Sequence, residues 1–303
     1  MEKILITGAS GYIGSSLIPL LEKEKGFELH LLSRTPIRSS HRVHVADISD
    51  TAALSRILSS VQPHYVIHLA ATGFNYAKKE TLDELVAVNF TATKTLADSC
   101  RAQAQFKRFI YLTTYMECQG TGRAIKADDA IVPQSDYAKS KSLASEYLSG
   151  LVGEKKIDAV CLRIFSVYGL NDRPFRFIPS IFDAMKNGKS VDTTSLKQKR
   201  DFVFVEDAAR AIISAIRVSR PASPVYNVGS GQPTALLDVA NKIKALYPDS
   251  KGSINTGAKP DRPGEAPCYF ADISRTVKEL GWKPQVSLDE GLARTKKFYS
   301  SSN

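Results

Sequence analysis

The sequence lacks the features that mark membrane-spanning, secreted and low-complexity proteins. No run of apolar residues approaches the roughly 18 that a membrane-spanning helix needs. Near the start only three apolar residues stand together, at positions 4–6, too few for the hydrophobic core of a secretory signal. Glycine and proline occur 18 and 14 times among 303 residues, too rarely for a collagen-like or linker protein. We therefore expect a globular protein with no membrane partner.

Cysteine is also scarce. The four cysteines lie far apart and form no C-x-x-C pair; they are Cys100, Cys118, Cys161 and Cys268. This spacing supports neither a disulfide framework nor a cysteine-based zinc site. We expect a reducing, cytoplasmic location and no bound metal.

Concentrated positive charge is missing, although the chain as a whole is basic. Lysine and arginine together number 41, against 31 aspartates and glutamates, which gives a formal net charge of +10. The basic residues are spread along the chain, with no run of five and no nucleic-acid-binding motif. We therefore expect no nucleic-acid partner, since scattered positive charge suits a phosphate-bearing small molecule equally well.

What the chain does contain is a regular alternation of short apolar runs and longer amphipathic segments, with 43% hydrophobic residues overall. The expected strands are 3–7, 28–32, 43–45, 65–69, 108–113 and 159–164. The expected helices between them are 12–24, 51–60, 82–104 and 135–149. Such alternation is typical of parallel β-α-β units. It predicts an α/β fold with a doubly wound, right-handed, parallel Rossmann-type sheet.

After Gly169 the pattern changes to short strands, separated helices and frequent prolines. This indicates a smaller, irregular C-terminal α/β lobe. We predict a Rossmann domain over residues 1–165 and a second lobe over 166–303. The segment of about 202–218 is expected to return to the first domain, with a strand at 202–205 and a helix at 207–218.

The first expected strand runs directly into a glycine-rich turn. Gly8, Gly11 and Gly14 follow the spacing G-x-x-G-x-x-G, and a helix comes next. The first glycine permits a tight turn, the second lets the backbone approach a phosphate, and the third lets the helix pack on the strand. A tight turn without a ligand is the simpler explanation. The position at the start of an α/β domain favours a dinucleotide pyrophosphate bound at the helix N-terminus.

The end of the second strand bears on the choice of dinucleotide. NAD-selective sites carry an acid about 20 residues beyond the loop, which binds the ribose 2′-hydroxyl. Here those positions hold Ser33 and Arg34. A guanidinium can pair with a 2′-phosphate in bidentate fashion, and Arg38 is close enough in sequence to assist. A solvated surface arginine is the alternative. We predict NADP(H) as the cofactor, with NAD as the alternative.

Tyr137 and Lys141 stand four residues apart on an expected helix, so both lie on one face. A phenol with a pKa near 10 is a poor acid or base at neutral pH. A neighbouring ammonium stabilises the phenolate and lowers that pKa, which makes the tyrosine a usable proton donor or acceptor. The pair alone is common on solvated helices, but downstream of the glycine loop it indicates carbonyl or alcohol redox chemistry.

These features resemble the extended short-chain dehydrogenase/reductases, specifically the nucleotide-sugar epimerase/dehydratase/4-ketoreductase group. The resemblance extends over nearly the whole chain, through H-L-A-A at 68–71, R-D-F at 200–202 and R-P-G-E at 262–265. The expected cofactor-binding residues are Gly8, Ser10, Gly11, Tyr12, Ile13, Gly14, Arg34, Asp47, Ile48, Leu69, Ala70, Ala71, Tyr137 and Lys141. Asp47 matches a family aspartate that contacts adenine, with capping of the helix that begins near Asp50 as an equal alternative.

On the substrate side, the resemblance implies that Arg200 and Arg262 clamp the diphosphate of a nucleotide sugar, since guanidinium groups bind dianions in bidentate fashion. Ser166 stands where the family usually has an asparagine that contacts this diphosphate. The family also places a serine or threonine against the substrate oxygen. Counting five residues back from Gly120 gives Tyr115, whereas a shift of one residue gives Thr114.

We assign Thr114 to the substrate oxygen, with Tyr115 as the alternative and a purely structural Thr113–Thr114 pair as a third explanation. Dehydratases of this group carry an Asp-Glu pair after the catalytic threonine. The counterparts here are Met116 and Glu117. Without the aspartate, elimination of water is disfavoured, and Glu117 is interpreted as a polar loop residue.

The resemblance and the cofactor argument together predict NADPH-dependent reduction of the keto group of a nucleotide-diphosphate 4-keto-6-deoxyhexose. Tyr137 would be the acid, Lys141 would hold the ribose, and Thr114 would orient the oxygen. The alternatives are an NAD-dependent nucleotide-sugar 4-epimerase, a reductase of a non-sugar carbonyl and, least favoured, a non-enzymatic NADP sensor. The resemblance also implies a homodimer formed through helices 82–104 and 135–149.

Overall fold

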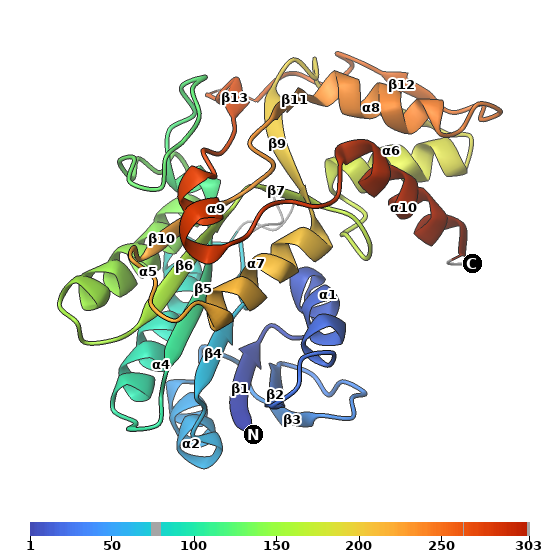
Figure 1. Ribbon diagram of the computed structural model, residues 1–303. Coiled ribbons are helices and arrows are strands. Elements are labelled where there is room, and N and C mark those ends of the chain that lie inside the picture. The colour runs from blue at the N-terminus through green and yellow to red at the C-terminus, as the bar shows by residue number, and fades with distance from the viewer. Residues whose placement is uncertain (74–79, 263, 302–303) are drawn as a thin grey trace.

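The computed structural model describes residues 1–73, 80–262 and 264–301, and it has the expected α/β fold (Figure 1). Its larger sheet has seven parallel strands in the order β10-β6-β5-β4-β1-β2-β3. They are β1 (Glu2–Thr7), β2 (Phe27–Ser33), β3 (Arg42–Val45), β4 (Tyr65–His68), β5 (Arg108–Thr114), β6 (Ala159–Ile164) and β10 (Val225–Val228). The doubly wound parallel sheet is confirmed, and β10 is an addition that the sequence did not indicate.

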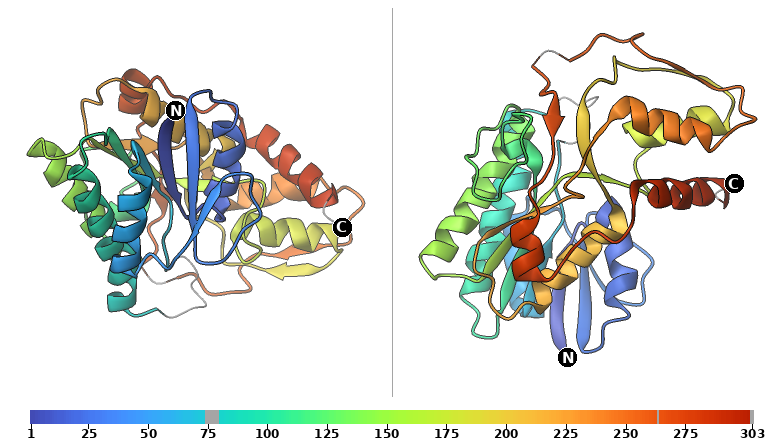
Figure 2. Two further views of the ribbon diagram at one scale, coloured as in Figure 1. Left: turned by 90° about the horizontal axis from the view of Figure 1, so that it is seen from below. Right: turned by 45° about the horizontal axis from the view of Figure 1, so that its top comes forward.

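Helices cover both faces of this sheet (Figures 1 and 2). On one face α1 (Tyr12–Leu21) packs against α7 (Val205–Arg217). On the other face lie α2 (Thr51–Val61), α4 (Ala92–Arg101) and α5 (Asp136–Gly153). Because both faces are covered, the central strands are mostly apolar, and β5 is buried at every position. In the described part of the chain, no helix is both long and apolar enough to cross a membrane.

The segment expected as one helix at 82–104 is interrupted. It consists of α3 (Leu82–Val86), the π-helical turn η1 (Ala87–Thr91) and α4. Asn89 lies in η1 and is fully buried. Its side chain accepts from the Thr72 N–H at 2.9 Å and donates to the Thr72 carbonyl at 3.1 Å and to Ser140 at 2.9 Å. Through these hydrogen bonds, Asn89 in the π-helical turn connects the loop after β4 to α5.

The C-terminal lobe contains two small sheets and its own apolar core. In one sheet β9 (Lys199–Phe204) pairs with β7 (Ser166–Tyr168), β11 (Pro233–Ala235) and β13 (Cys268–Tyr269). In the other β8 (Ser190–Asp192) pairs with β12 (Ser253–Asn255). The helices of this lobe are α6 (Phe177–Lys186), α8 (Leu236–Ala245) and α10 (Leu288–Ser301). A further helix, α9 (Ser274–Leu280), packs beside β10 and α7.

The expected return of residues 202–218 to the first sheet is half wrong. Residues 202–204 belong to β9, which pairs within the second lobe, because β7 leaves the first sheet and offers β9 a parallel partner. The helix part, α7, does pack against the larger sheet. Asp207 near its start accepts backbone hydrogen bonds from Gln285 and Val286, both at 2.9 Å. The C-terminal segment is thereby held against the first lobe.

Candidate active site

The strand order of the larger sheet reverses at β1, which lies between β4 and β2. In open α/β sheets, ligands bind at such a reversal, beyond the carboxyl ends of the strands. The glycine turn follows β1 there, and residues 69–71 follow β4. The topology therefore brings these two expected binding segments together.

The geometry of the glycine turn fits a dinucleotide pyrophosphate. Gly8 has a φ of +67°, and a Cβ there would lie 2.6 Å from the backbone nitrogen of Ala70, so only glycine is accommodated. A Cβ on Gly14 would lie 2.5 Å from the Ala9 carbonyl oxygen, so this glycine permits close packing of α1 on β1. Gly11 precedes α1 and has no side chain to cap it. The N–H groups at the start of α1 are thus available to an anion.

A central cavity opens in front of this turn. Its lining unites the glycine turn with the expected catalytic residues: Gly8, Gly11, Tyr12, Ile13, Gly14, Leu69, Ala71, Thr113, Thr114, Tyr115, Tyr137, Lys141 and Ser166 all contribute. The glycine turn and the segment around Tyr137 are far apart in the sequence. They reach the same cavity because the strands β1, β4 and β5 are neighbours in the sheet. The expected catalytic residues and the turn expected to bind phosphate therefore line one cavity.

A second cavity, the strand-end cavity, lies at the end of β2. It is lined by Ser10, Arg34, Asp47, Ile48 and Ala70 together with Gly8, Gly11, Leu69 and Ala71. The hydroxyls of Ser10 and Ser33 are 3.2 Å apart, so the end of β2 contacts the glycine turn through neutral groups. Arg34 is exposed at this cavity. This side of the site fits the adenosine half of a dinucleotide.

Asp47 is not a helix cap. Asp50 caps α2, accepting from the Ala53 N–H at 2.9 Å. Asp47 instead accepts from the N–H and the hydroxyl of Ser49, at 2.9 and 2.7 Å. These hydrogen bonds, with a smaller contribution from Arg34, hold the pKa of Asp47 below its usual range. The carboxylate stays charged at the rim of the strand-end cavity.

Tyr137 and Lys141 lie on α5, whose N-cap Ser135 accepts from the Ala138 N–H. Lys141 is only 3% exposed, and its Nζ lies 4.2 Å from the centre of the Tyr111 ring. Burial lowers the pKa of Lys141 to about 7, although Glu117 opposes this shift. Gly73 backs the Tyr137 ring, since a Cβ there would come within 3.0 Å of it. The tyrosine is thus held against the cavity beside a lysine that titrates near neutrality.

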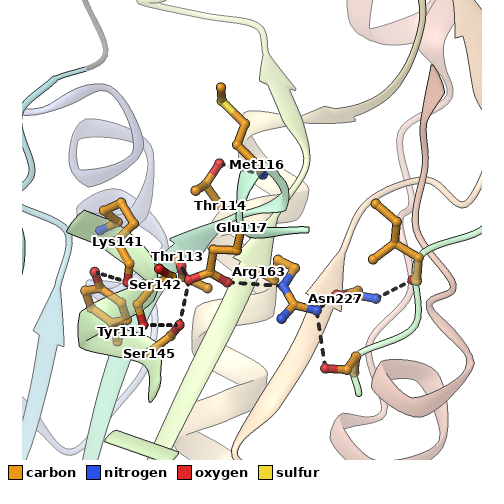
Figure 3. A network of polar contacts seen from close by, with 12 residues as sticks. Tyr111, Thr113, Thr114, Met116, Glu117, Lys141, Ser142, Ser145, Arg163 and Asn227 are labelled. Atoms are coloured by element: carbon orange, nitrogen blue, oxygen red, sulfur yellow. Dashed lines mark hydrogen bonds and ion pairs between the residues drawn. The ribbon is translucent and has the colours of Figure 1, made fainter. Parts of the chain in front are cut away.

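Thr114 and Tyr115 both line the central cavity, so either residue is placed to contact the substrate oxygen. Thr114 ends β5, and its hydroxyl accepts from the Met116 N–H at 3.3 Å (Figure 3). The Tyr115 ring packs between Phe165 and Tyr269, with centroid distances of 5.4 and 4.9 Å. Thr114 is a hydroxyl-bearing residue at the end of β5, whereas the aromatic ring of Tyr115 forms part of the cavity lining and contacts Tyr269 in the second lobe.

Glu117 is not a polar loop residue, as its place in the sequence suggested. It ends the 3₁₀ turn η2 (Tyr115–Glu117) and is 0% exposed. Its carboxylate pairs with Arg163 at 3.3 Å and accepts hydrogen bonds from Thr113 and Ser145 (Figure 3). The sequence did not predict the burial of Glu117, because the residues that bind its carboxylate lie on three other elements.

Two further cavities adjoin the central one: the first is lined by the C-terminal lobe alone, and the second lies between the lobes. Arg200 and Arg262 line both, and Ser166 lines the first. Arg200 is buried, pairs with Glu265 at 2.5 Å and lies over the Tyr269 ring at 5.3 Å. Pro263, within the expected R-P-G-E loop, lies outside the described residues. The structure therefore brings both expected arginines to one space beyond the catalytic residues.

Three charged residues at this junction were missed by the sequence reasoning. Arg173 lines both the central and the strand-end cavity, while Arg176 lines the central cavity and the two further cavities that contain Arg200 and Arg262. Asp172 is buried and binds Arg176 at 2.9 Å, and the Arg176 guanidinium lies 5.9 Å from the centre of the Tyr12 ring. The available signal was the charged stretch N-D-R-P-F-R at 171–176, directly after Gly169.

Comparison with known proteins identifies the class of this enzyme. The model of the NAD dependent epimerase/dehydratase family matches residues 4–229. The chain belongs to this family, the extended branch of the short-chain dehydrogenase/reductases. Together with the glycine turn, this defines an enzyme that works with an NAD(P) dinucleotide.

Individual relatives span several reactions. A probable dTDP-glucose 4,6-dehydratase of Sinorhizobium fredii is 28% identical, covering 98% of this chain and 92% of the relative. A dTDP-4-dehydro-6-deoxyglucose reductase of Escherichia coli is 27% identical, covering 95% of each chain. MoeE5, solved with UDP-glucuronic acid and NAD, is 27% identical, with a TM-score of 0.88 over 99% of this chain and 100% of its own. Other relatives are named as dehydratases and 4-epimerases.

Proposed function

We propose that this enzyme uses NADPH to reduce the keto group of a nucleotide-diphosphate 4-keto-6-deoxyhexose. The observation that carries the proposal is the shared central cavity, in which Thr114, Tyr137 and Lys141 face the glycine turn. The two further cavities lined by Arg200 and Arg262 adjoin it and suit the diphosphate of the substrate. A reductase of a dTDP-4-keto-6-deoxy sugar among the relatives supports the same class of substrate.

Each residue has a distinct task. When bound, NADPH supplies the hydride. Tyr137 donates its hydroxyl proton to the substrate oxygen as negative charge develops there, and the Lys141 ammonium favours the resulting phenolate. Lys141 also holds the nicotinamide ribose, while the Thr114 hydroxyl orients the substrate oxygen. The N–H groups at the start of α1 bind the pyrophosphate, and Arg34 pairs with the 2′-phosphate.

Elimination of water is disfavoured, even though several relatives are named as dehydratases. Met116 stands in the place of the expected acid and cannot transfer a proton. Glu117 is fully buried and already engaged with Arg163, Thr113 and Ser145. Neither side chain is available to remove or deliver a proton on a bound sugar.

A nucleotide-sugar 4-epimerase with NAD is the second candidate. It is favoured by relatives named as 4-epimerases and by the NAD in MoeE5, and it would use the same Tyr137 and Lys141. The absence of an acid at Ser33 and Arg34 argues against it, because a carboxylate there would select the free ribose hydroxyl. A non-sugar carbonyl substrate carries no diphosphate, so its reduction would not explain the presence of Arg200 and Arg262 at the site.

Cofactor titration separates these candidates. We expect the purified protein, checked first for bound cofactor, to bind NADPH at least about tenfold more tightly than NADH in a fluorescence titration. Arg34→Ala should remove that preference and leave NADH binding unchanged. Arg42→Ala is the matched control, since this side chain is 76% exposed on the adjacent strand β3. Copurified NAD, or equal affinities in the unaltered protein, would favour the epimerase.

A positive outcome leads to a direct assay of the reaction. NADPH oxidation would be followed with nucleotide-diphosphate 4-keto-6-deoxyhexoses, and with the corresponding non-sugar ketones as comparison. Turnover of the keto sugars that is lost in Arg200→Ala would support the proposal. Turnover of simple ketones that is insensitive to this change would contradict it.

A further inference from the structure

The Glu117 carboxylate lies at the centre of a buried polar network beside the catalytic lysine (Figure 3). Its Oε1 accepts hydrogen bonds from the Thr113 hydroxyl and, at 2.6 Å, from the Ser145 hydroxyl. Its Oε2 lies 3.3 Å from Nε of Arg163. Glu117 is 0% and Arg163 1% exposed. A buried pair is costly unless its remaining donors and acceptors are satisfied, and here both carboxylate oxygens are.

The Arg163 guanidinium is also held by hydrogen bonds on the side that faces away from Glu117. Its Nη1 donates to the carbonyls of Lys126 and Ala127, at 3.3 and 3.2 Å, and contacts Oδ1 of Asn227 at 3.4 Å. Asn227 in turn donates to the Ile125 carbonyl at 2.7 Å. The guanidinium therefore cannot swing toward solvent, and Glu117 keeps its place.

Lys141 is surrounded mainly by neutral groups. The ring of Tyr111 on β5 lies under its Nζ, Tyr137 precedes it by one turn of α5, and Cys161 on β6 acts on it weakly. His68 on β4 is neutral near pH 7, because burial and the Lys141 charge lower its pKa to about 3. Glu117 on η2 exerts the strongest electrostatic stabilisation of the ammonium, against the burial that lowers the pKa of Lys141 to about 7.

We propose that Glu117, which accepts a hydrogen bond from Ser145 one turn of α5 beyond Lys141, is a positioning residue whose negative charge favours the ammonium form of Lys141. Its hydrogen bond from Thr113 also fixes the end of β5 that carries Thr114. Glu117 transfers no proton in the reaction and acts only through its neighbours. This inference rests on the roles proposed above for Tyr137 and Lys141, but the protonation state of Lys141 is measurable without substrate or cofactor.

The test is a pH titration of Lys141 by NMR in cofactor-free protein labelled with ¹³C,¹⁵N-lysine. The Lys141 signal is the one that titrates near neutrality and is absent from Lys141→Met. An amine is charged below its pKa, and losing a nearby carboxylate lowers that pKa. We therefore expect Glu117→Gln to move the midpoint to lower pH by at least about one unit. Ser145→Ala removes a hydrogen bond to the same carboxylate but keeps its charge, and should leave the midpoint within about 0.3 units.

Coincident midpoints for the unaltered protein and Glu117→Gln would overturn the proposal. If Glu117→Gln does not fold because Arg163 has lost its partner, the double variant Glu117→Gln/Arg163→Gln removes both buried charges. It should also move the midpoint to lower pH, but by less than Glu117→Gln alone, because loss of the Arg163 charge acts weakly in the opposite direction. A midpoint that does not fall in this variant would overturn the proposal. Because the titration involves no turnover, a failure of the proposed reductase activity would appear only in the substrate assay.

Discussion

Lys141 shows how strongly a single residue depends on its surroundings. Its spacing from Tyr137 is a property of the helix, but its pKa of about 7 comes from burial in the fold. A lysine that titrates near neutrality keeps its ammonium for only part of the physiological pH range. Its effect on the tyrosine therefore weakens as the pH rises through 7, and activity that needs the charged lysine should decline with it.

Replacement of the proposed proton donor gives a direct prediction. Tyr137→Phe keeps the ring that packs near Gly73 but removes the hydroxyl, so turnover should fall by at least about 100-fold. Cofactor affinity should change by less than about threefold, since Lys141 and the glycine turn remain. Steady-state kinetics and fluorescence titration measure the two effects. A sensor protein without turnover would show no change in its output.

The sequence was informative about residues whose task is local. Gly8, Gly11 and Gly14 could be assigned because a turn and the following helix are contiguous in the chain. Glu117 could not, since its partner Arg163 lies on another strand and the two meet only in the folded chain. Asp172 and Arg176 are four residues apart in one stretch, but the sequence does not show that this stretch reaches the cavities. Whether Thr114 or Tyr115 contacts the substrate depends on side-chain direction, which spacing alone does not determine.

At the scale of elements, the π-helical turn η1 matters more than its five residues suggest. It converts one expected helix into two and directs Asn89 inward, toward the backbone of Thr72 and the side chain of Ser140. The loop after β4 carries Ala71 at the central cavity, so this single amide helps to shape the cofactor side of the site.

Removal of that amide should be costly. Asn89→Ala leaves the half-buried N–H and carbonyl of Thr72 and the buried Ser140 hydroxyl without these partners, and we expect the free energy of unfolding to fall by about 2–3 kcal/mol. Urea denaturation followed by circular dichroism would measure the change. Lys94→Ala, on the exposed side of α4, should alter stability by less than about 0.5 kcal/mol. Equal effects of the two changes would show that the inward amide contributes nothing.

Element prediction succeeded where hydrophobic periodicity is strong and failed where pairing decides. The six early strands were recognisable because each contains a short apolar run, and all but the edge strand β3 are largely buried. β10 and β9 carry similar signals, yet one completes the larger sheet and the other joins the second lobe. Which sheet each strand joins depends on its partner, β6 for β10 and β7 for β9. The residues of β9 and β10 alone do not predict that pairing.

At the scale of the whole molecule, the family resemblance predicts a homodimer through α3, η1, α4 and α5. The structure leaves apolar side chains exposed on these helices, with Leu82 40% and Leu143 41% accessible. Phe90 and Tyr147 pack beside each other at 6.1 Å and join this surface. Pairing of two such surfaces would bury the exposed leucines.

A charge at the centre of this surface should prevent pairing. We expect light scattering to give about twice the chain mass of 33.2 kDa for the unaltered protein and the single-chain mass for Leu143→Glu. Val277→Glu is the control, because Val277 is equally exposed, at 42%, but lies on α9. A monomer in the unaltered protein at micromolar concentration would remove the dimer prediction.

The chain passes from the larger sheet to the smaller one with a single residue between them. β6 ends at Ile164 and β7 begins at Ser166, so Phe165 alone forms the crossing. Its N–H donates to the Val228 carbonyl at 3.0 Å, and its ring stacks on Tyr115. A connection of one residue leaves little freedom to change the spacing between the two sheets. The spacing between the central cavity and the site proposed for the diphosphate is therefore set by the backbone, and we expect that adapting the protein to longer or shorter substrates would require a change in this connection as well as in the side chains around it.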